Sequence, residues 1–118
     1  MAKILIRKGA TPKENSKSVD LLAEVWQRKY YFEMKTIRRS NTASQIRNGV
    51  AKLYEYSYLY ERGNRTNIVL VLVLNNKPRL RWIVDYLIKD RNIHPCWREN
   101  SGFEYSEESR QSLDPVFR

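Results

Sequence analysis

The feature that most constrains the fold is an uninterrupted apolar segment in the second half of the chain. Ile68–Leu74 reads IVLVLVL, and four of its seven residues are β-branched. A strand with one solvated face alternates apolar and polar residues, whereas a run without alternation is typical of a central strand covered on both faces. The chain must therefore place other elements on two faces of one sheet, which predicts an α/β layer architecture.

Three shorter segments supply the other expected strands. Strand formers over residues 19–25 and 30–35 predict two strands, and residues 26–29 form the polar turn between them. A last strand is expected over residues 93–97, where Pro95 would confine it to an edge of the sheet.

Two segments have the periodicity of amphipathic helices. The first is expected from about residue 41 to residue 61, because one face gathers Ile46, Gly49, Val50, Leu53, Ser57 and Tyr60. The second covers residues 79–91. The predicted order is strand, strand, helix, strand, helix, strand. Helices between the later strands imply crossovers, so the sequence predicts a central mixed β-sheet flanked by helices.

At 118 residues the chain is expected to form one domain with three parts. Residues 1–18 are rich in Gly, Pro, Ser, Asn and Lys and predict an N-terminal arm. Residues 19–99 form the core. Residues 100–118 predict a flexible, polar and acidic tail, with Leu113, Val116 and Phe117 as docking points.

The charge of the core points to a polyanionic partner. The net charge is +9, and residues 1–99 hold 20 basic and 9 acidic side chains, whereas residues 100–118 hold 2 and 4. Such a surface predicts attraction to nucleic acid before an anionic membrane. One cysteine, Cys96, excludes a disulfide within the chain and a cysteine-based zinc site. Without a signal peptide or an apolar run of membrane-spanning length, the expected location is the cytoplasm, with no membrane partner.

Asp20, Glu33 and Lys35 are the residues most suited to chemistry. Alternation along a strand places Glu33 and Lys35 on one face and Phe32 and Met34 on the other, and pairing of the first two strands brings Asp20 to the same edge. Two carboxylates, the backbone carbonyl of Met34 and waters would suit Mg²⁺, with Mn²⁺ as an alternative. A metal there would activate water beside a phosphate, and Lys35 would orient the nucleophile or neutralise developing charge.

These residues and the helix after them resemble the PD-(D/E)XK nuclease superfamily, most closely its RecB-like and restriction-endonuclease-like branches. Asp20, the segment Glu33-Met34-Lys35, and the helical segment Gln45-Ile46-Arg47-Asn48-Gly49-Val50-Ala51-Lys52-Leu53-Tyr54-Glu55-Tyr56 carry the resemblance over residues 19–97. It implies a restriction-endonuclease-like core, Asp20 and Glu33 as metal ligands, Lys35 as the catalytic lysine, and a helix whose polar residues face the site.

The helix departs from the pattern of many relatives, which carry a glutamine four residues before a tyrosine. In this sequence the residue four positions before Tyr56 is Lys52, and the glutamine, Gln45, lies seven residues before Lys52. Either Gln45 serves the site or Lys52 contacts phosphate in its place, and we rank Gln45 first. Seven residues are close to two helical turns, so one face could present both.

Further basic residues are candidates for contacts with nucleic acid. Arg38 and Arg39 directly precede the start of the first helix, where free N–H groups favour phosphate. Arg47 and Lys52 extend the set along that helix, and Lys77, Arg79 and Arg81 extend it elsewhere or solvate the second helix. The tyrosines at 54, 56, 58 and 60 are expected mainly to pack against the sheet. Trp26, Trp82 and Trp97 are expected in the core or in turns.

The leading hypothesis is a metal-dependent nuclease, with DNA favoured over RNA as the substrate. One alternative is a non-catalytic nucleic-acid-binding module with the same fold, and another is an interaction domain that meets an acidic inhibitor protein. The superfamily core begins with a helix that the composition of residues 1–18 does not favour. The chain could therefore be a toxin-type nuclease domain cut from a larger protein. Alternatively, a homodimer partner or a further domain could complete the fold.

Overall fold

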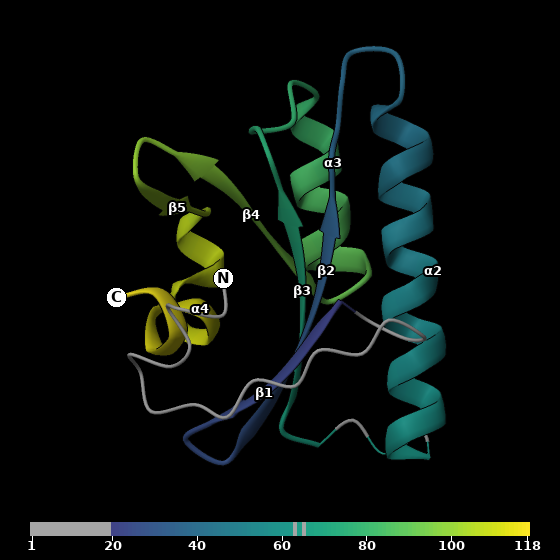
Figure 1. Ribbon diagram of the computed structural model, residues 1–118, viewed down its shortest axis with the longest axis vertical. Coiled ribbons are helices and arrows are strands. Elements are labelled where there is room, and N and C mark those ends of the chain that lie inside the picture. The colour runs from purple at the N-terminus through teal and green to yellow at the C-terminus, as the bar shows by residue number, and fades with distance from the viewer. Residues whose placement is uncertain (1–19, 63, 65) are drawn as a thin grey trace.

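A five-stranded sheet forms the centre of the computed structural model, which describes residues 20–62, 64 and 66–118 (Figure 1). The arm expected over residues 1–18 lies outside the described residues. The spatial order of the strands is the chain order, namely β1 (Leu21–Val25), β2 (Arg28–Lys35), β3 (Ile68–Leu74), β4 (Ile93–Glu99) and β5 (Gly102–Glu104). The predicted order of strands and helices is confirmed up to β4, and the chain then adds one more strand and one more helix.

The sheet is mixed, as its connections require. β2, β3 and β4 run parallel, while β1 pairs antiparallel with β2 and β5 pairs antiparallel with β4. The turn between β1 and β2 has two residues rather than the expected four, because β2 already begins at Arg28. Trp26 and Gln27 have φ of 54° and 67°. Two positive φ values give the turn the twist that matches a tight antiparallel pair.

Helices cover both faces of the sheet, as the apolar run predicts. α2 (Thr42–Glu61) and α3 (Arg81–Asp85), which continues as a π-helical turn over Tyr86–Asp90, pack on one face together with Leu70, Leu72 and Leu74. α4 (Arg110–Phe117) packs on the other face (Figure 1), together with Val69, Val71 and Val73. None of the helices in the described part of the chain has both the length and the apolar character needed to cross a membrane.

Residues 100–118 differ from the flexible tail expected from their polarity. They form β5, a 3₁₀ turn over Glu107–Ser109 and α4. The three expected docking points are confirmed, because Leu113 and Val116 are fully buried and Phe117 packs against the same cluster. Ser109 Oγ also lies 2.9 Å from His94 Nδ1. A few well-spaced apolar residues thus hold this acidic segment against the sheet.

β4 is not an edge strand, although Pro95 suggested one. β5 pairs with Trp97–Glu99, so within residues 20–62, 64 and 66–118 the half of β4 that contains Pro95 pairs with β3 alone. Proline lacks a backbone N–H and is tolerated where no donor is needed. The short length of β5 therefore accommodates it.

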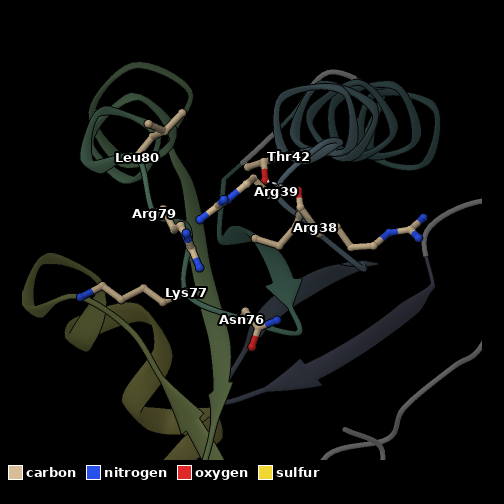
Figure 2. Close-up of a pocket in the computed structure, with 8 residues that line it drawn as sticks. Arg38, Arg39, Thr42, Asn76, Lys77, Arg79 and Leu80 are labelled. Atoms are coloured by element: carbon tan, nitrogen blue, oxygen red, sulfur yellow. Dashed lines mark hydrogen bonds between the residues drawn. The ribbon is translucent and has the colours of Figure 1, made fainter.

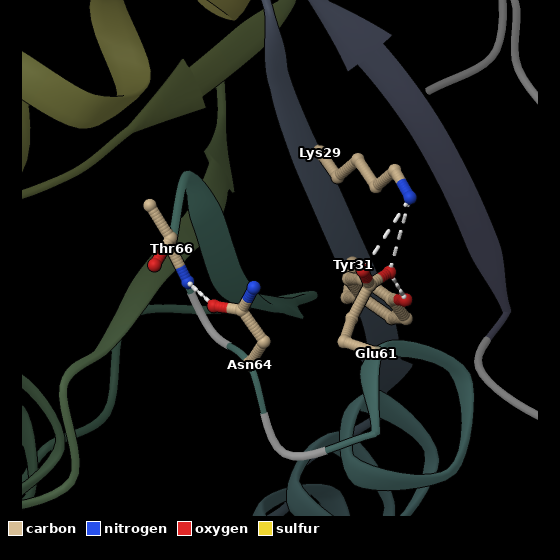
Figure 3. A network of polar contacts seen from close by, with 5 residues as sticks. All are labelled: Lys29, Tyr31, Glu61, Asn64 and Thr66. Atoms are coloured by element: carbon tan, nitrogen blue, oxygen red, sulfur yellow. Dashed lines mark hydrogen bonds and ion pairs between the residues drawn. The ribbon is translucent and has the colours of Figure 1, made fainter.

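The carboxyl end of α2 is fixed to the start of β2. Glu61 accepts hydrogen bonds from the Tyr31 hydroxyl and from Lys29 Nζ, the latter at 3.4 Å (Figure 3). Tyr31 is fully buried, and burial together with Glu61 raises the pKa of its hydroxyl. The helix is thereby held along the length of β2, with its amino end beside the carboxyl end of that strand.

Gly49 lets α2 lie close to the sheet at its midpoint. A Cβ atom at this position would lie 2.5 Å from Leu72 Cδ1 and 3.5 Å from Lys35 Cγ. Leu72 is completely buried, so its side chain has little room to give way. The absence of a side chain therefore sets the distance between α2 and the end of β2.

We predict that Gly49→Ala destabilises the protein by about 1–3 kcal/mol, the usual cost of overpacking a core. Alanine favours a helix more than glycine does, so a loss of stability would have to come from the contact with Leu72. Urea unfolding followed by circular dichroism measures the change. Asn48→Ala, at the neighbouring exposed position, is the control and should leave stability unchanged or slightly raised. Equal stability of Gly49→Ala and the parent protein would contradict the close approach.

Candidate active site

Glu33 forms the centre of a charged cluster at the carboxyl end of β2. Its side chain is 1% exposed, and Oε2 lies 3.6 Å from Lys35 Nζ and 3.4 Å from Lys52 Nζ. Lys35 follows two residues later on the same face of β2, whereas Lys52 comes from α2, which covers that face. The predicted placement of Glu33 and Lys35 on one face of the strand is confirmed. Phe32 packs on the opposite face, as expected.

Only one of the two oxygens of the buried Glu33 carboxylate is paired with a cation. Its Oε1 atom is buried and has no hydrogen-bond partner. Burial, followed by the nearby negative charge of Asp20, raises the pKa of Glu33 above its ordinary value, while Lys52 and Lys35 oppose that rise. Burying a carboxylate costs several kcal/mol unless its oxygens are fully paired, so stability alone favours an apolar residue here. Such a perturbed acid is typical of a functional position.

Asp20 lies just before β1, next to this cluster. Leu21 is paired with Phe32, so Asp20 falls opposite Glu33. Its Oδ2 atom accepts a hydrogen bond of 2.7 Å from the backbone N–H of Met34. The N–H and C=O groups of one strand residue point to the same neighbouring strand, so the Met34 carbonyl faces the β1 side as well. Asp20 and Glu33 thus lie at the same end of the β1–β2 pair, close enough for the charge of Asp20 to raise the pKa of Glu33.

The donor set is small for a metal site. Across residues 20–62, 64 and 66–118, no three histidine, cysteine, aspartate or glutamate side chains form a group that could hold a metal ion. Asp20, Glu33 and the Met34 carbonyl supply three oxygen donors. Mg²⁺ commonly keeps several waters and takes one or two carboxylates, so this set fits that ion better than one that needs an all-protein cage. The unpartnered Oε1 of Glu33 is the atom that such an ion would satisfy.

The structure distinguishes Lys52 from Gln45. Lys52 reaches Glu33, whereas Gln45 Nε2 donates a 3.0 Å hydrogen bond to the Thr36 carbonyl, just beyond the end of β2. The two side chains do lie along one side of the helix, but seven residues separate them by about 10 Å. Gln45 therefore supports the loop that leaves the cluster, and Lys52 contacts the carboxylate. The spacing of residues within the helix does not show how far along β2 the helix lies. The sequence alone could therefore not decide between Gln45 and Lys52.

The loop between β2 and α2 is held in place by side chains. Asn75, just after β3, accepts a 2.7 Å hydrogen bond from the Ile37 N–H and donates one of 3.3 Å to the Ile37 carbonyl. Asn41 Oδ1 accepts a 2.6 Å hydrogen bond from the Arg38 N–H, and the Thr42 hydroxyl donates one of 2.7 Å to the Arg38 carbonyl. Because its backbone is fixed at these points, the loop presents Arg38 and Arg39 from a rigid base.

A cationic cavity of about 580 Å³ adjoins this loop (Figure 2). We call it the basic pocket, and the residues that line it are Ile37, Arg38, Arg39, Thr42, Asn76, Lys77, Arg79 and Leu80. Four of these are cations, and none of these eight is an acid. Figure 2 shows Arg39 and Arg79 extending toward each other from opposite sides of the hollow, whereas Arg38 extends away from them. Lys77 Nζ lies 5.5 Å from the centre of the Trp97 ring. Arg39 and Arg79 therefore are the pair of cations that converge here, and such a pair without a carboxylate favours a bound anion.

The basic pocket lies where the parallel strands end. Ile37 comes four residues after Glu33, so the pocket wall lies within about 14 Å of the acidic cluster along the chain. Ligands of open α/β sheets commonly bind outside the carboxyl ends of the strands. Arg38 and Arg39, expected to contact nucleic acid, line this pocket together with Lys77 and Arg79, for which the sequence left a basic track and solvation of the second helix as alternatives. Arg47 is exposed on α2 and does not line the pocket.

Trp82 was expected in the core or a turn but is 59% exposed on α3. Ile83 and Leu87 occupy the buried stripe of that helical segment, which leaves Trp82 outside. The helical periodicity could have predicted this exposure, because Trp82 is not one of the residues on the apolar face of the helix. Trp26 in the two-residue turn is 81% exposed, and Trp97 is buried.

Comparison of the chain with known protein families, with curated proteins and with solved structures found no match. The geometry described above is therefore the basis for assigning a function.

We predict that Glu33→Gln stabilises the protein at neutral pH in the absence of divalent metal. Burial raises the pKa of Glu33, so the folded state favours the neutral carboxyl more strongly than the unfolded chain does. The associated stabilisation is complete below the ordinary value of 4.5 and is lost as the pH rises through the folded-state pKa. Glutamine imitates the neutral form at every pH.

Urea unfolding in EDTA at neutral pH and again below pH 4.5 measures this difference. The advantage of Glu33→Gln should be present in the first condition and vanish in the second. Glu55→Gln, at an exposed position of α2, is the matched control and should change little. A variant that is less stable than the parent protein at neutral pH would show that the ion pairs outweigh burial.

Proposed function

We propose that this protein is a metal-dependent nuclease that hydrolyses phosphodiester bonds at the Asp20, Glu33 and Lys35 cluster. The observation that carries the proposal is the buried Glu33 carboxylate, which has one unpartnered oxygen beside a second acid and two lysines. The basic pocket near the same strand end adds the cationic surface that a nucleic-acid backbone requires.

The restriction-endonuclease-like fold is part of the same proposal. An antiparallel pair, β1 and β2, precedes α2, and α2 connects β2 to the parallel strand β3. The acids fall at the start of β1 and the end of β2, which agrees with the positions that the resemblance implies. This agreement in order and placement supports the proposal.

The residues present fit a divalent cation, as the geometry of Asp20, Glu33 and Met34 suggests. These groups would hold Mg²⁺ or Mn²⁺, and the ion would neutralise charge on the phosphate and lower the pKa of the attacking water. The Asp20 carboxylate is oriented for this by the Met34 N–H. The burial of Glu33 limits competing water, which strengthens its electrostatic interactions.

Lys35 is suited to stabilise the charge that develops on the phosphate. Its side chain is 14% exposed, and Glu33 holds its ammonium group at the edge of the cluster. In the reaction, the oxygen of water bonds to phosphorus and gives up one proton to solvent, while the ester P–O bond breaks and the leaving oxygen takes one proton from solvent. Lys35 donates hydrogen bonds to the phosphate oxygens, which bear more charge in the transition state. Lys52, with 45% of its side chain exposed, can leave Glu33 to contact a neighbouring phosphate.

One observation favours a second function, that of a non-catalytic nucleic-acid-binding module. Both lysines already occupy Glu33 Oε2, and Asp20 is already bonded to the Met34 N–H. If those contacts persist when nucleic acid binds, the cluster is a structural support for the basic pocket. The two functions differ in their dependence on metal.

We predict that the purified protein cleaves DNA or RNA with Mg²⁺ or Mn²⁺ and not in EDTA. Lys35→Ala should lower the cleavage rate by about 100-fold or more, the usual effect of removing one group that stabilises the transition state. Lys29→Ala is the matched control, because Lys29 is another ion-paired lysine of β2 but lies at the far end of the strand. A gel assay with labelled single- and double-stranded substrates measures the rates.

Equal cleavage by Lys35→Ala and the parent protein would refute the assigned role of Lys35. Salt-dependent binding without cleavage in any metal would instead support the binding module.

A further inference from the structure

The exposed aromatic side chains of α3 and of the π-helical turn after it form a surface that begins two residues beyond Leu80 of the basic pocket. Trp82 is 59% exposed and Tyr86 is 37% exposed, and their ring centroids lie 6.2 Å apart. They are four residues apart on one helical segment and so share its outer side. Leu80, which is half exposed, belongs to the pocket wall. Large exposed apolar surface of this kind marks an interaction site more often than chance.

The distance between the two features suits one ligand. Trp82 follows Leu80 by two residues, so their Cα atoms lie at most about 7 Å apart. The indole ring is therefore close enough along the chain to reach the rim of the basic pocket. One segment of chain, residues 79–82 (Arg79-Leu80-Arg81-Trp82), thus alternates cations with apolar side chains.

The cations of the basic pocket and the exposed aromatic rings together indicate the chemical class of the ligand. Arg39 and Arg79, which extend toward each other in the basic pocket, complement phosphate. The pocket volume of about 580 Å³ lies within the roughly 300–1,000 Å³ typical of small-ligand sites. Aromatic rings bind nucleobases by stacking on their faces. A strand of nucleic acid supplies a phosphate and a base at each step.

We infer that the basic pocket and the Trp82–Tyr86 surface together bind a single-stranded segment of nucleic acid, with backbone phosphate at Arg39 and Arg79 and an unpaired base on Trp82. Bases in a duplex are already stacked and present only their edges, so a duplex could use the pocket but not the indole. The inference deepens the proposed function by assigning it a single-stranded substrate, and it rests on that function only in taking nucleic acid as the ligand.

Binding measured in EDTA separates this inference from catalysis. Fluorescence anisotropy with a labelled oligothymidylate, an oligouridylate and a duplex of the same length should show tighter binding of both single strands than of the duplex. Trp82→Ala should weaken single-strand binding by about tenfold, the usual value of one stacked base, and leave duplex binding nearly unchanged. Trp82→Phe should restore part of the loss. Trp26→Ala, which removes the exposed tryptophan of the turn, should change neither.

The fluorescence emission of Trp82 gives a second measurement of binding. In a Trp26→Phe background, Trp82 is the exposed tryptophan of the described residues, since Trp97 is 5% exposed. Addition of oligothymidylate should quench its emission as binding proceeds. Arg39→Ala should weaken binding of single strands and duplex alike and reduce the salt dependence, whereas Arg47→Ala, outside the pocket, should have a smaller effect.

Equal binding of single strand by Trp82→Ala and the parent protein would overturn the inference, as would tighter binding of the duplex or no binding of any nucleic acid. Absence of cleavage with these binding results intact would refute the nuclease function and leave the single-strand site standing.

Discussion

Glu33 carries a carboxylate into the contact between β2 and α2, and the local structure is arranged around that group. The glycine at position 49 allows α2 to approach, so that Lys52 can reach across from the helix while Lys35 reaches along the strand. Two cations oppose the cost of burial, yet one oxygen of Glu33 has no partner and the pKa of the carboxyl is raised. This is the arrangement expected of a group kept for binding or chemistry.

The surrounding contacts fix the parts that meet at this cluster. Glu61, together with Tyr31 and Lys29, holds the carboxyl end of α2 at the start of β2. At the other end of the helix, side-chain hydrogen bonds from Asn41 and Asn75 hold the loop that carries the arginines of the basic pocket. A site whose supports are rigid keeps its charges in place without a ligand, which lowers the cost of binding one.

The sequence predicted the features that depend on local pattern. The apolar run at Ile68–Leu74 identified the central strand, and alternation along β2 correctly placed Glu33 and Lys35 on one face. It did not predict that Lys52 rather than Gln45 contacts Glu33, because that depends on how α2 is positioned along the strand. β5 and α4 were missed because two short elements in a polar segment are stabilised by tertiary burial of Leu113 and Val116, which local propensity does not register.

Binding of Mn²⁺ is the direct test of the proposal that Asp20 and Glu33 form a divalent metal site. Electron paramagnetic resonance measures free Mn²⁺ in the presence of the protein without nucleic acid. We expect the parent protein to bind Mn²⁺ and both Asp20→Asn and Glu33→Gln to abolish binding. Glu24→Gln, at an exposed acid of β1, should retain it. Binding that is absent in the parent protein, or unchanged in both site variants, would contradict the proposal.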